Sequence, residues 1–186
     1  GAGIGATCLV LVLWQTVIWT TGVARFILPS PALVAQTIWE SRALLTEHAV
    51  VTMAEVLIGL LLGAALGFVS AIGLVASPTV RALVRPILVF SQAVPVFALA
   101  PILTLWLGFG LWSKITMTII IIYFPVTSSF FDALMRTNRD WIGLAKVMGA
   151  SPAGIMWHIR VPAALPGFAS GLRLAAVYAP IGAIIG

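Results

Sequence analysis

Few side chains in this 186-residue sequence could carry out covalent or metal chemistry, and their spacing gives them no common site. His48 and His158 are the only histidines, and the spans predicted below place them on opposite sides of a membrane. Cys8 is the only cysteine, so the 186 residues can form neither an intrachain disulfide nor a thiolate metal cluster. The sequence also contains no glycine-rich phosphate-binding loop of the Walker type. We therefore expect no catalytic residue and no metal site, and we expect any ATP to be bound by another chain.

Charged residues could instead relay protons, and four of them lie close together in the second half of the chain. They fall at the predicted end of a helix, where an ion-paired or solvated face is the simpler interpretation: Asp132, Arg136, Arg139 and Asp140. Glu55 and Arg173 differ, because each falls within an apolar stretch, where an ionised side chain is costly and usually paired or functional. The sequence identifies a partner for neither, and Arg173 could equally extend back to the lipid headgroups.

The composition places the whole chain in lipid. Hydrophobic residues make up 61% of the sequence, charged residues only 8%, and the mean hydropathy is +1.15. A soluble domain of this length needs more charge on its surface. The net charge of +5 does not indicate nucleic-acid binding, because the basic residues are scattered between apolar stretches. We therefore predict a membrane protein.

Five apolar segments are long enough to cross a hydrocarbon core of about 30 Å, which takes about 20 helical residues. They are, approximately, residues 4–22, 49–76, 87–107, 115–134 and 164–186. The first lacks a basic leader, so we interpret it as a span rather than a cleavable signal. The second contains Gly59, Gly63 and Gly67 at regular intervals, a row that lets a neighbouring helix approach closely.

The third segment is interrupted by Pro95 and Pro101. Each proline removes a backbone donor and clashes with the preceding turn, so both cannot sit in an undisturbed helix. Broken backbone at membrane depth is tolerated only where protein or a water-filled path satisfies it. We therefore expect this segment to face the interior of a bundle rather than lipid.

Two stretches between the spans are polar enough to lie outside the hydrocarbon. Residues 26–47 contain a Leu-Pro-Ser-Pro turn and then a periodic apolar pattern, which predicts an amphipathic helix at one interface. Residues 137–163 form the longer polar stretch, and their apolar residues recur at helical spacing on either side of a Gly-Ala-Ser-Pro sequence at 149–152. This pattern predicts two short helices joined by a tight turn.

The lysine and arginine counts predict the orientation of the chain. The loops on one side hold six of these residues: Arg81, Arg85, Arg136, Arg139, Lys146 and Arg160. The loops on the other side hold three: Arg25, Arg42 and Lys114. The bias places the Arg81 loop and residues 137–163 in the cytoplasm.

Residues 143–151, followed by residues 159–166, resemble the cytoplasmic coupling motif of the permeases of ABC importers. In that family the motif is Glu-Ala-Ala, then a glycine, then a spacer that ends in Ile-x-Leu-Pro. Here the Gly149-Ala150-Ser151 turn and the Pro-Ala-Ala-Leu-Pro exit at 162–166 match, whereas Gly143 and Leu144 replace the Glu and the first Ala. Any ion pair that the family's Glu makes with the ATPase is therefore absent. The similarity extends to residues 28–31, 101–110 and 171–173.

This resemblance implies that residues 137–163 dock in a groove of a separate ATPase. The residues that it assigns to coupling are Gly143, Leu144, Ala145, Met148, Gly149, Ala150, Ser151 and Pro162. Ala145 and Met148 are three residues apart, so we expect them on the docked face of the first short helix, with Gly149 as the turn. For the translocation path, the candidates are Pro95, Pro101 and Arg173.

The resemblance also implies partners and a location. It implies cytoplasmic ATPase subunits that hold ATP and magnesium, so that this chain binds no cofactor of its own. It further implies a second permease subunit, most simply an identical one, and an extracytoplasmic substrate-binding protein. The chain is then a multi-pass protein of the bacterial inner membrane that catalyses no reaction itself and moves a small polar solute.

Two questions of function stay open in the sequence. Residues 52–59 and 91–101 are similar to permeases for hydroxymethylpyrimidine, a thiamine precursor, in the branch that also imports nitrate, sulfonate and taurine. The alternative function is an ion-coupled secondary transporter or channel, which would need embedded acidic residues or inverted repeats. We find no internal repeat, and only Glu55 falls near membrane depth among the acidic residues.

These observations predict an all-α, polytopic membrane helix bundle. The sequence starts with Gly-Ala-Gly and stops within an apolar run, so we expect a fragment of one permease domain over residues 1–186. About five spans are expected in it and a sixth beyond it, with a cytoplasmic helix–turn–helix coupling loop at 137–163.

Overall fold

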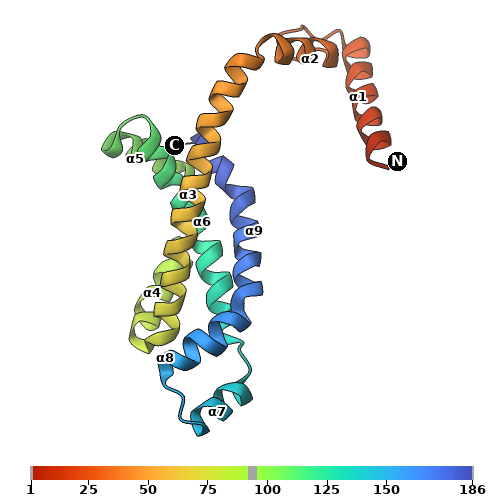
Figure 1. The fold of residues 1–186 in the computed structure, drawn as a ribbon. Coiled ribbons are helices and arrows are strands. Elements are labelled where there is room, and N and C mark those ends of the chain that lie inside the picture. Colours follow the sequence, from red (N-terminus) through yellow and green to blue (C-terminus); the bar gives the residue numbers. More distant parts are fainter. Residues whose placement is uncertain (1, 92–95, 186) are drawn as a thin grey trace. The chain divides into compact units, whose positions relative to one another are not determined.

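A computed structural model describes residues 2–91 and 96–185, and within that part every regular element is a helix (Figure 1). The helices are α1 (Ala2–Thr21), α2 (Pro31–Glu40), α3 (Arg42–Ala76), α4 (Pro78–Ser91), the 3₁₀ helix η1 (Val96–Leu99), α5 (Ala100–Leu107), α6 (Leu111–Met135), α7 (Arg139–Val147), α8 (Pro152–Ile155), the π-helical turn η2 (Met156–Arg160) and α9 (Val161–Ile185). The all-α class predicted from the sequence is confirmed.

Four helical stretches among the described residues are long and apolar enough to cross a membrane, where the sequence predicted five spans. They are Gly3–Thr21, Arg42–Ala76, Leu111–Met135 and Pro152–Ile185. The expected third span at 87–107 includes residues 92–95, which lie outside the described part, so it is not tested as a whole; its described residues belong to the end of α4, to η1 and to α5. Pro101 explains the start of α5: it occupies the first turn of that helix, where its missing N–H leaves no hydrogen bond unmade.

The chain divides into two compact units, Gly1–Val51 and Thr52–Gly186. In the first unit, Ser30 caps α2 by accepting a hydrogen bond from the Leu33 N–H at 3.3 Å, and Pro31 begins the helix. The single amphipathic helix expected after this turn is instead two helices, because α2 stops at Glu40 and α3 starts at Arg42.

The second unit is built on α6, which lies between α3 and α9 (Figure 1). The predicted glycine row of α3 makes the close approach. A Cβ on Gly59 would lie 2.6 Å from the Thr118 side chain, and one on Gly63 would lie 2.6 Å from Ile122. One on Gly67 would lie 2.9 Å from a side chain one turn further on, that of Val126. The close approach expected from this row is therefore confirmed, and its partner is α6.

Glycines of α9 let it approach α6 from another side. A Cβ on Gly182 would lie 2.7 Å from the Cα of Thr118, and one on Gly171 would lie 3.1 Å from the carbonyl oxygen of Pro125. Phe68 of α3 stacks on Phe130 of α6 with ring centroids 4.7 Å apart, and Phe168 of α9 meets Phe68 edge-on at 5.3 Å. Each of the three helices thus contributes one ring to the core at this level.

The register of these contacts fixes the direction of each helix. Along α3 and α6, Gly59 faces Thr118 and Gly63 faces Ile122, so both numbers increase together and the helices are parallel. Along α9 and α6 the order is reversed, so those helices are antiparallel.

Arg81 and Arg85, which we expected in a loop, lie in α4, the helix that follows α3 after Ser77.

Candidate coupling segment and transport site

The first helix of the candidate coupling segment, α7, ends in a Schellman turn at Gly149. The Ala150 N–H donates to the Ala145 carbonyl at 2.9 Å, and the Gly149 N–H donates to the Lys146 carbonyl at 3.0 Å. This pattern requires a left-handed residue after the helix, and Gly149 has a φ of 80°. The prediction of Gly149 as the turn residue is confirmed by its backbone.

The next helix, α8, begins at Pro152, directly after its N-cap Ser151. The Ser151 side chain accepts a hydrogen bond from the Gly154 N–H at 3.1 Å, and Pro152 takes the first helical position. We expected a separate short helix here. Instead α8, the π-helical turn η2 and α9 run on as one helical stretch from Pro152 to Ile185. The second arm of the hairpin is thus the start of a membrane-spanning helix.

The two faces of α7 differ from the sequence prediction. Ala145 is 9% exposed, because it faces the rest of the chain, whereas Met148 is 78% exposed. Ala145 and Met148 therefore differ in exposure within the chain, and their docking on an ATPase stays a prediction. Leu144, Val147 and Met148 form the exposed apolar face instead, with Val147 87% exposed. They are spaced i, i+3 and i+4, which places them side by side on a helix.

Val147 is the residue of this face that the sequence reasoning missed. Its signal was available, since Leu144, Val147 and Met148 show helical spacing before a glycine turn. The family motif drew attention to position 145 instead. The remaining residues assigned to coupling are exposed in the structure: Gly143, Ala150, Ser151 and Pro162.

A groove separates the inner side of the hairpin from the end of α3. It has a volume of about 530 Å³, and its walls include Ile72 and Val75 of α3, Ala150 at the turn, and Trp157 and Arg160 of η2. The aromatic ring of Trp157 also approaches Phe68 of the core, with centroids 6.4 Å apart. The coupling segment therefore contacts the core at its base and leaves its tip exposed.

Of the three candidates for the translocation path, two lie in the described part of the chain. Pro95 falls outside the described residues. Pro101 is exposed at the start of α5, and Arg173 is exposed in the middle of α9. Gly171 and Ala175, two residues to either side of Arg173, are buried. Since successive helical residues are about 100° apart, Arg173 points away from the face of α9 that packs on α6.

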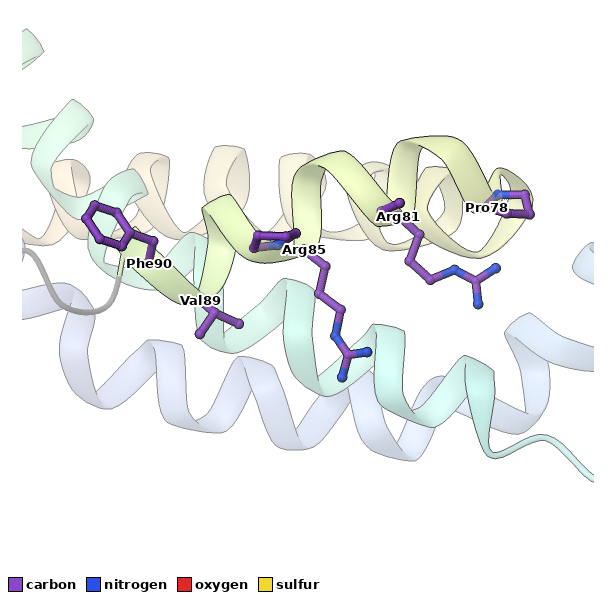
Figure 2. Close-up of a pocket in the computed structure, with 7 residues that line it drawn as sticks. Pro78, Arg81, Arg85, Val89 and Phe90 are labelled. Atoms are coloured by element: carbon purple, nitrogen blue, oxygen red, sulfur yellow. The ribbon is translucent and has the colours of Figure 1, made fainter.

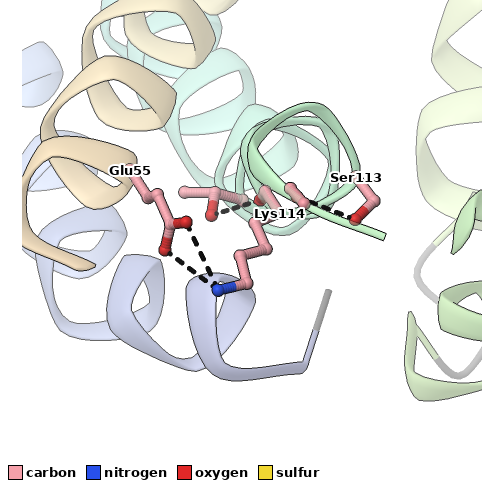
Figure 3. A network of polar contacts seen from close by, with 5 residues as sticks. Glu55, Ser113 and Lys114 are labelled. Atoms are coloured by element: carbon pink, nitrogen blue, oxygen red, sulfur yellow. Dashed lines mark hydrogen bonds and ion pairs between the residues drawn. The ribbon is translucent and has the colours of Figure 1, made fainter. Parts of the chain in front are cut away.

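Glu55 has a partner that the sequence did not identify. Its carboxylate oxygens lie 3.3 Å and 3.5 Å from the Lys114 Nζ, so the pair joins α3 to the first turn of α6 (Figure 3). The Glu55 side chain is 3% exposed and that of Lys114 is 34% exposed. The pair lies one turn before the contact of Gly59 with Thr118, in the same register. No spacing in the sequence could reveal it, because the two residues are 59 positions apart.

Comparison with known proteins gives this arrangement a family. Residues 59–186 match the family of binding-protein-dependent transport system inner membrane components. The chain belongs to this family. It is also 47% identical, over 96% of its length and 73% of the relative's, to a probable ABC transporter permease protein of Haemophilus influenzae.

Two further relatives have names that state a solute. The formylaminopyrimidine transport permease protein of Halalkalibacterium halodurans is 38% identical over 96% of this chain and 71% of its own length. The riboflavin transport system permease protein of Chloroflexus aurantiacus is 34% identical over 96% of this chain and 67% of its own length.

The chain is thus the transmembrane permease subunit of an ATP-driven importer of the ABC type, and a multi-pass protein of the inner membrane. This confirms the family predicted from the coupling motif. It decides against the ion-coupled secondary transporter or channel. Permeases of such importers work with an ATPase and with a substrate-binding protein, in agreement with the partners expected from the sequence.

Proposed function

We propose that the chain forms a path for a planar, nitrogen-containing heteroaromatic solute, together with a second and most simply identical permease subunit. A separate ATPase that holds ATP and magnesium drives the path through α7, the Gly149 turn and α8, and this chain binds no cofactor of its own. The observation that carries the coupling role is the exposed apolar face of Leu144, Val147 and Met148 beside a rigid turn.

The connection between the turn and the membrane supports this role. A protein that docks on Val147 and Met148 contacts the two residues directly before Gly149, within the Schellman turn. Beyond the turn, one helical stretch runs to Ile185, and its glycines rest on α6. A push on the turn would therefore act on the start of the same helical stretch that contains α9. Because Gly143 stands where the family's motif has Glu, docking relies on apolar packing rather than on that charge.

The solute class rests on relatives rather than on a pocket. Among the relatives whose names state a solute, those at 38% and 34% identity are named for a formylaminopyrimidine and riboflavin, and those at 31% and 28% are named for taurine and aliphatic sulfonates. The solutes of the first two, which have the higher identity, contain a planar heteroaromatic ring with nitrogen atoms and polar substituents. We infer the same chemical class for this chain, which agrees with the pyrimidine suggested by residues 52–59 and 91–101.

The second subunit is supported by Arg173. An ionised side chain that faces lipid in the middle of a span is costly. Arg173 points away from α6, and no ion pair joins it to a carboxylate in the described part of the chain. A partner subunit or a water-filled path on that side of α9 would provide the polar surroundings that it needs.

Docking on α7 is tested with the double variant Val147→Asp and Met148→Asp. Two carboxylates in an apolar contact should abolish both co-purification of the ATPase and substrate-stimulated ATP hydrolysis in reconstituted vesicles, because each buried charge would be unpaired. The matched control is Phe109→Asp, which places a charge at an exposed phenylalanine outside the coupling segment. If the double variant bound the ATPase and hydrolysed ATP as the unmodified protein does, the coupling assignment would be wrong.

A further inference from the structure

One face of α4 combines exposed apolar side chains with two arginines, whose guanidinium groups contact α3 and α6. Seven residues of this face, all from α4, line an open site on the surface. They are Pro78, Arg81, Ala82, Arg85, Pro86, Val89 and Phe90. The spacing of three and four residues places them on one side of the helix, and Figure 2 shows the arginine side chains extending from that side.

Contacts with neighbouring helices orient both arginines, but no carboxylate among the described residues neutralises their charge. The Nε of Arg81 donates to the Leu74 carbonyl at 3.1 Å, which orients the guanidinium at the end of α3. The Arg85 guanidinium lies over the Phe131 ring, 5.9 Å from its centroid. No carboxylate pairs with either one among the described residues. A guanidinium has five N–H donors, so both retain donors for an anion.

The face changes from basic to apolar along its length. Arg81 lies in the first turn of α4, directly after the end of the long apolar helix α3, where a headgroup region is expected. Phe90 lies nine residues further on, which is about 14 Å along a helix axis. Val89 and Phe90 are both well exposed, as are Leu83 and Ile87 elsewhere on α4. A phospholipid has the same order, with an anionic phosphate followed by apolar chains.

We propose that this face of α4 binds an anionic phospholipid, with the phosphate between Arg81 and Arg85 and an acyl chain along Val89 and Phe90. Basic sites at the cytoplasmic ends of membrane helices recognise such headgroups. Docking by a second copy is less well matched in charge. The sequence has five acidic residues, Glu55 is already paired, and only Asp132 and Asp140 lie on the same predicted side as the arginines. A cytoplasmic protein would not reach Val89 and Phe90 at membrane depth.

The site is tested by native mass spectrometry of the purified permease. The protein is titrated with phosphatidylglycerol and, separately, with phosphatidylethanolamine of the same acyl chains. The unmodified protein should bind phosphatidylglycerol more tightly. The double variant Arg81→Gln and Arg85→Gln should lose about fivefold in this preference per arginine, as expected for basic residues near anionic lipid. The control Arg25→Gln and Arg42→Gln makes the same change in net charge elsewhere and should keep the preference.

Two further measurements separate the lipid from other occupants. Phe90→Ser leaves the charge unchanged and should weaken the binding of both lipids, which also covers the case in which the arginine variant does not fold. Inorganic phosphate should not displace phosphatidylglycerol, because it makes no contact with Val89 and Phe90. Equal binding of the two lipids by the unmodified protein, or full displacement by phosphate, would overturn the proposal. So would an arginine variant that keeps its lipid but loses a cross-link between permease subunits.

Discussion

At the scale of single residues, Gly149 is the position whose backbone the structure constrains most clearly in the coupling segment. Its φ of 80° lies in the left-handed region, and an added Cβ would meet nothing within 4 Å. The penalty for a side chain here is therefore one of backbone conformation and not of space, which is about 1–2 kcal/mol for an ordinary residue. A Cβ at position 149 would therefore strain the backbone but would not clash with a neighbouring atom.

We predict that Gly149→Val will loosen the turn and reduce substrate-stimulated ATP hydrolysis strongly, while Gly149→Asn will stay close to the unmodified protein. Asparagine tolerates the left-handed region and valine does not. ATP hydrolysis and solute uptake in reconstituted vesicles would measure both variants. Gly22→Val is the matched control, since Gly22 also has a positive φ of 61° with open space around it but lies outside the coupling segment. Equal activity of the Asn and Val variants at position 149 would show that the turn conformation does not matter for coupling.

At the scale of helices, the sequence predicted local features better than pairings. The glycine row of α3 indicated a close helix contact, and the contact exists. However, nothing in the row could indicate that α6 is the partner, because that choice depends on side chains 59 positions away. The turn at Gly149 was predictable from a glycine followed by Ser151 and Pro152, which are local signals for the end and start of helices.

The failures have physical causes as well. The two prolines predicted a break in the expected span at 87–107, but hydropathy and proline positions did not predict that α5 begins at Ala100 with Pro101 in its first turn. The difference in exposure between Ala145 and Met148 was not predicted, because a spacing of three residues within the nine-residue helix α7 does not show which residues the rest of the chain covers.

The contact of α3 with α6 can be tested by changing its size. Gly63→Ala places a methyl group 2.6 Å from Ile122, so we predict a loss of about 1–3 kcal/mol in stability from overpacking. Adding Ile122→Val should recover part of that loss, because the smaller side chain makes room. Gly73→Ala, on the same helix with nothing within 4 Å, should not destabilise the protein. Thermal unfolding in detergent would measure all four proteins. A Gly63→Ala variant as stable as Gly73→Ala would contradict the close contact.

The ion pair between Glu55 and Lys114 joins the same two helices, one turn before the contact of Gly59 with Thr118. We predict that Lys114→Met destabilises the protein more than Glu55→Gln does. Lys114→Met leaves a carboxylate that is 3% exposed without its counter-charge, whereas Lys114 is one-third exposed and can turn toward water or headgroups. The double variant should be more stable than Lys114→Met alone. Unfolding midpoints in detergent give the double-mutant cycle, and additive losses would mean that the pair contributes no coupling.

At the scale of the whole chain, the parallel direction of α3 and α6 has a consequence for topology. Two consecutive parallel spans require the chain to return between them, so the segment from Ser77 to Gly110 must connect the end of α3 to the start of α6 at the opposite end of the bundle. Helices α4 and α5 lie in this returning segment. The register therefore requires a crossing between the second and fourth apolar segments, where the sequence predicted a span at 87–107.

This topology predicts which side of the membrane each turn occupies. The ends of α3 and α6 and the start of α9 lie at one end of the second unit, together with Arg81, Arg136 and Lys146. The charge bias makes that end cytoplasmic. Phe109, in the turn before α6, lies at the opposite end and is 96% exposed.

We therefore predict opposite labelling of two single-cysteine variants by a membrane-impermeant thiol reagent in intact cells. In a Cys8→Ser background, the cysteine of Phe109→Cys should react from outside, and that of Lys146→Cys should react only after the membrane is permeabilised. Both positions are exposed, so access to the reagent and not burial decides the result. The Cys8→Ser protein without a new cysteine gives the background. Labelling at position 146 in intact cells would mean that the orientation is reversed and that a cytoplasmic ATPase cannot reach the coupling segment. Labelling at position 109 alone would place α7 and its exposed apolar face in the cytoplasm, where ATP is available.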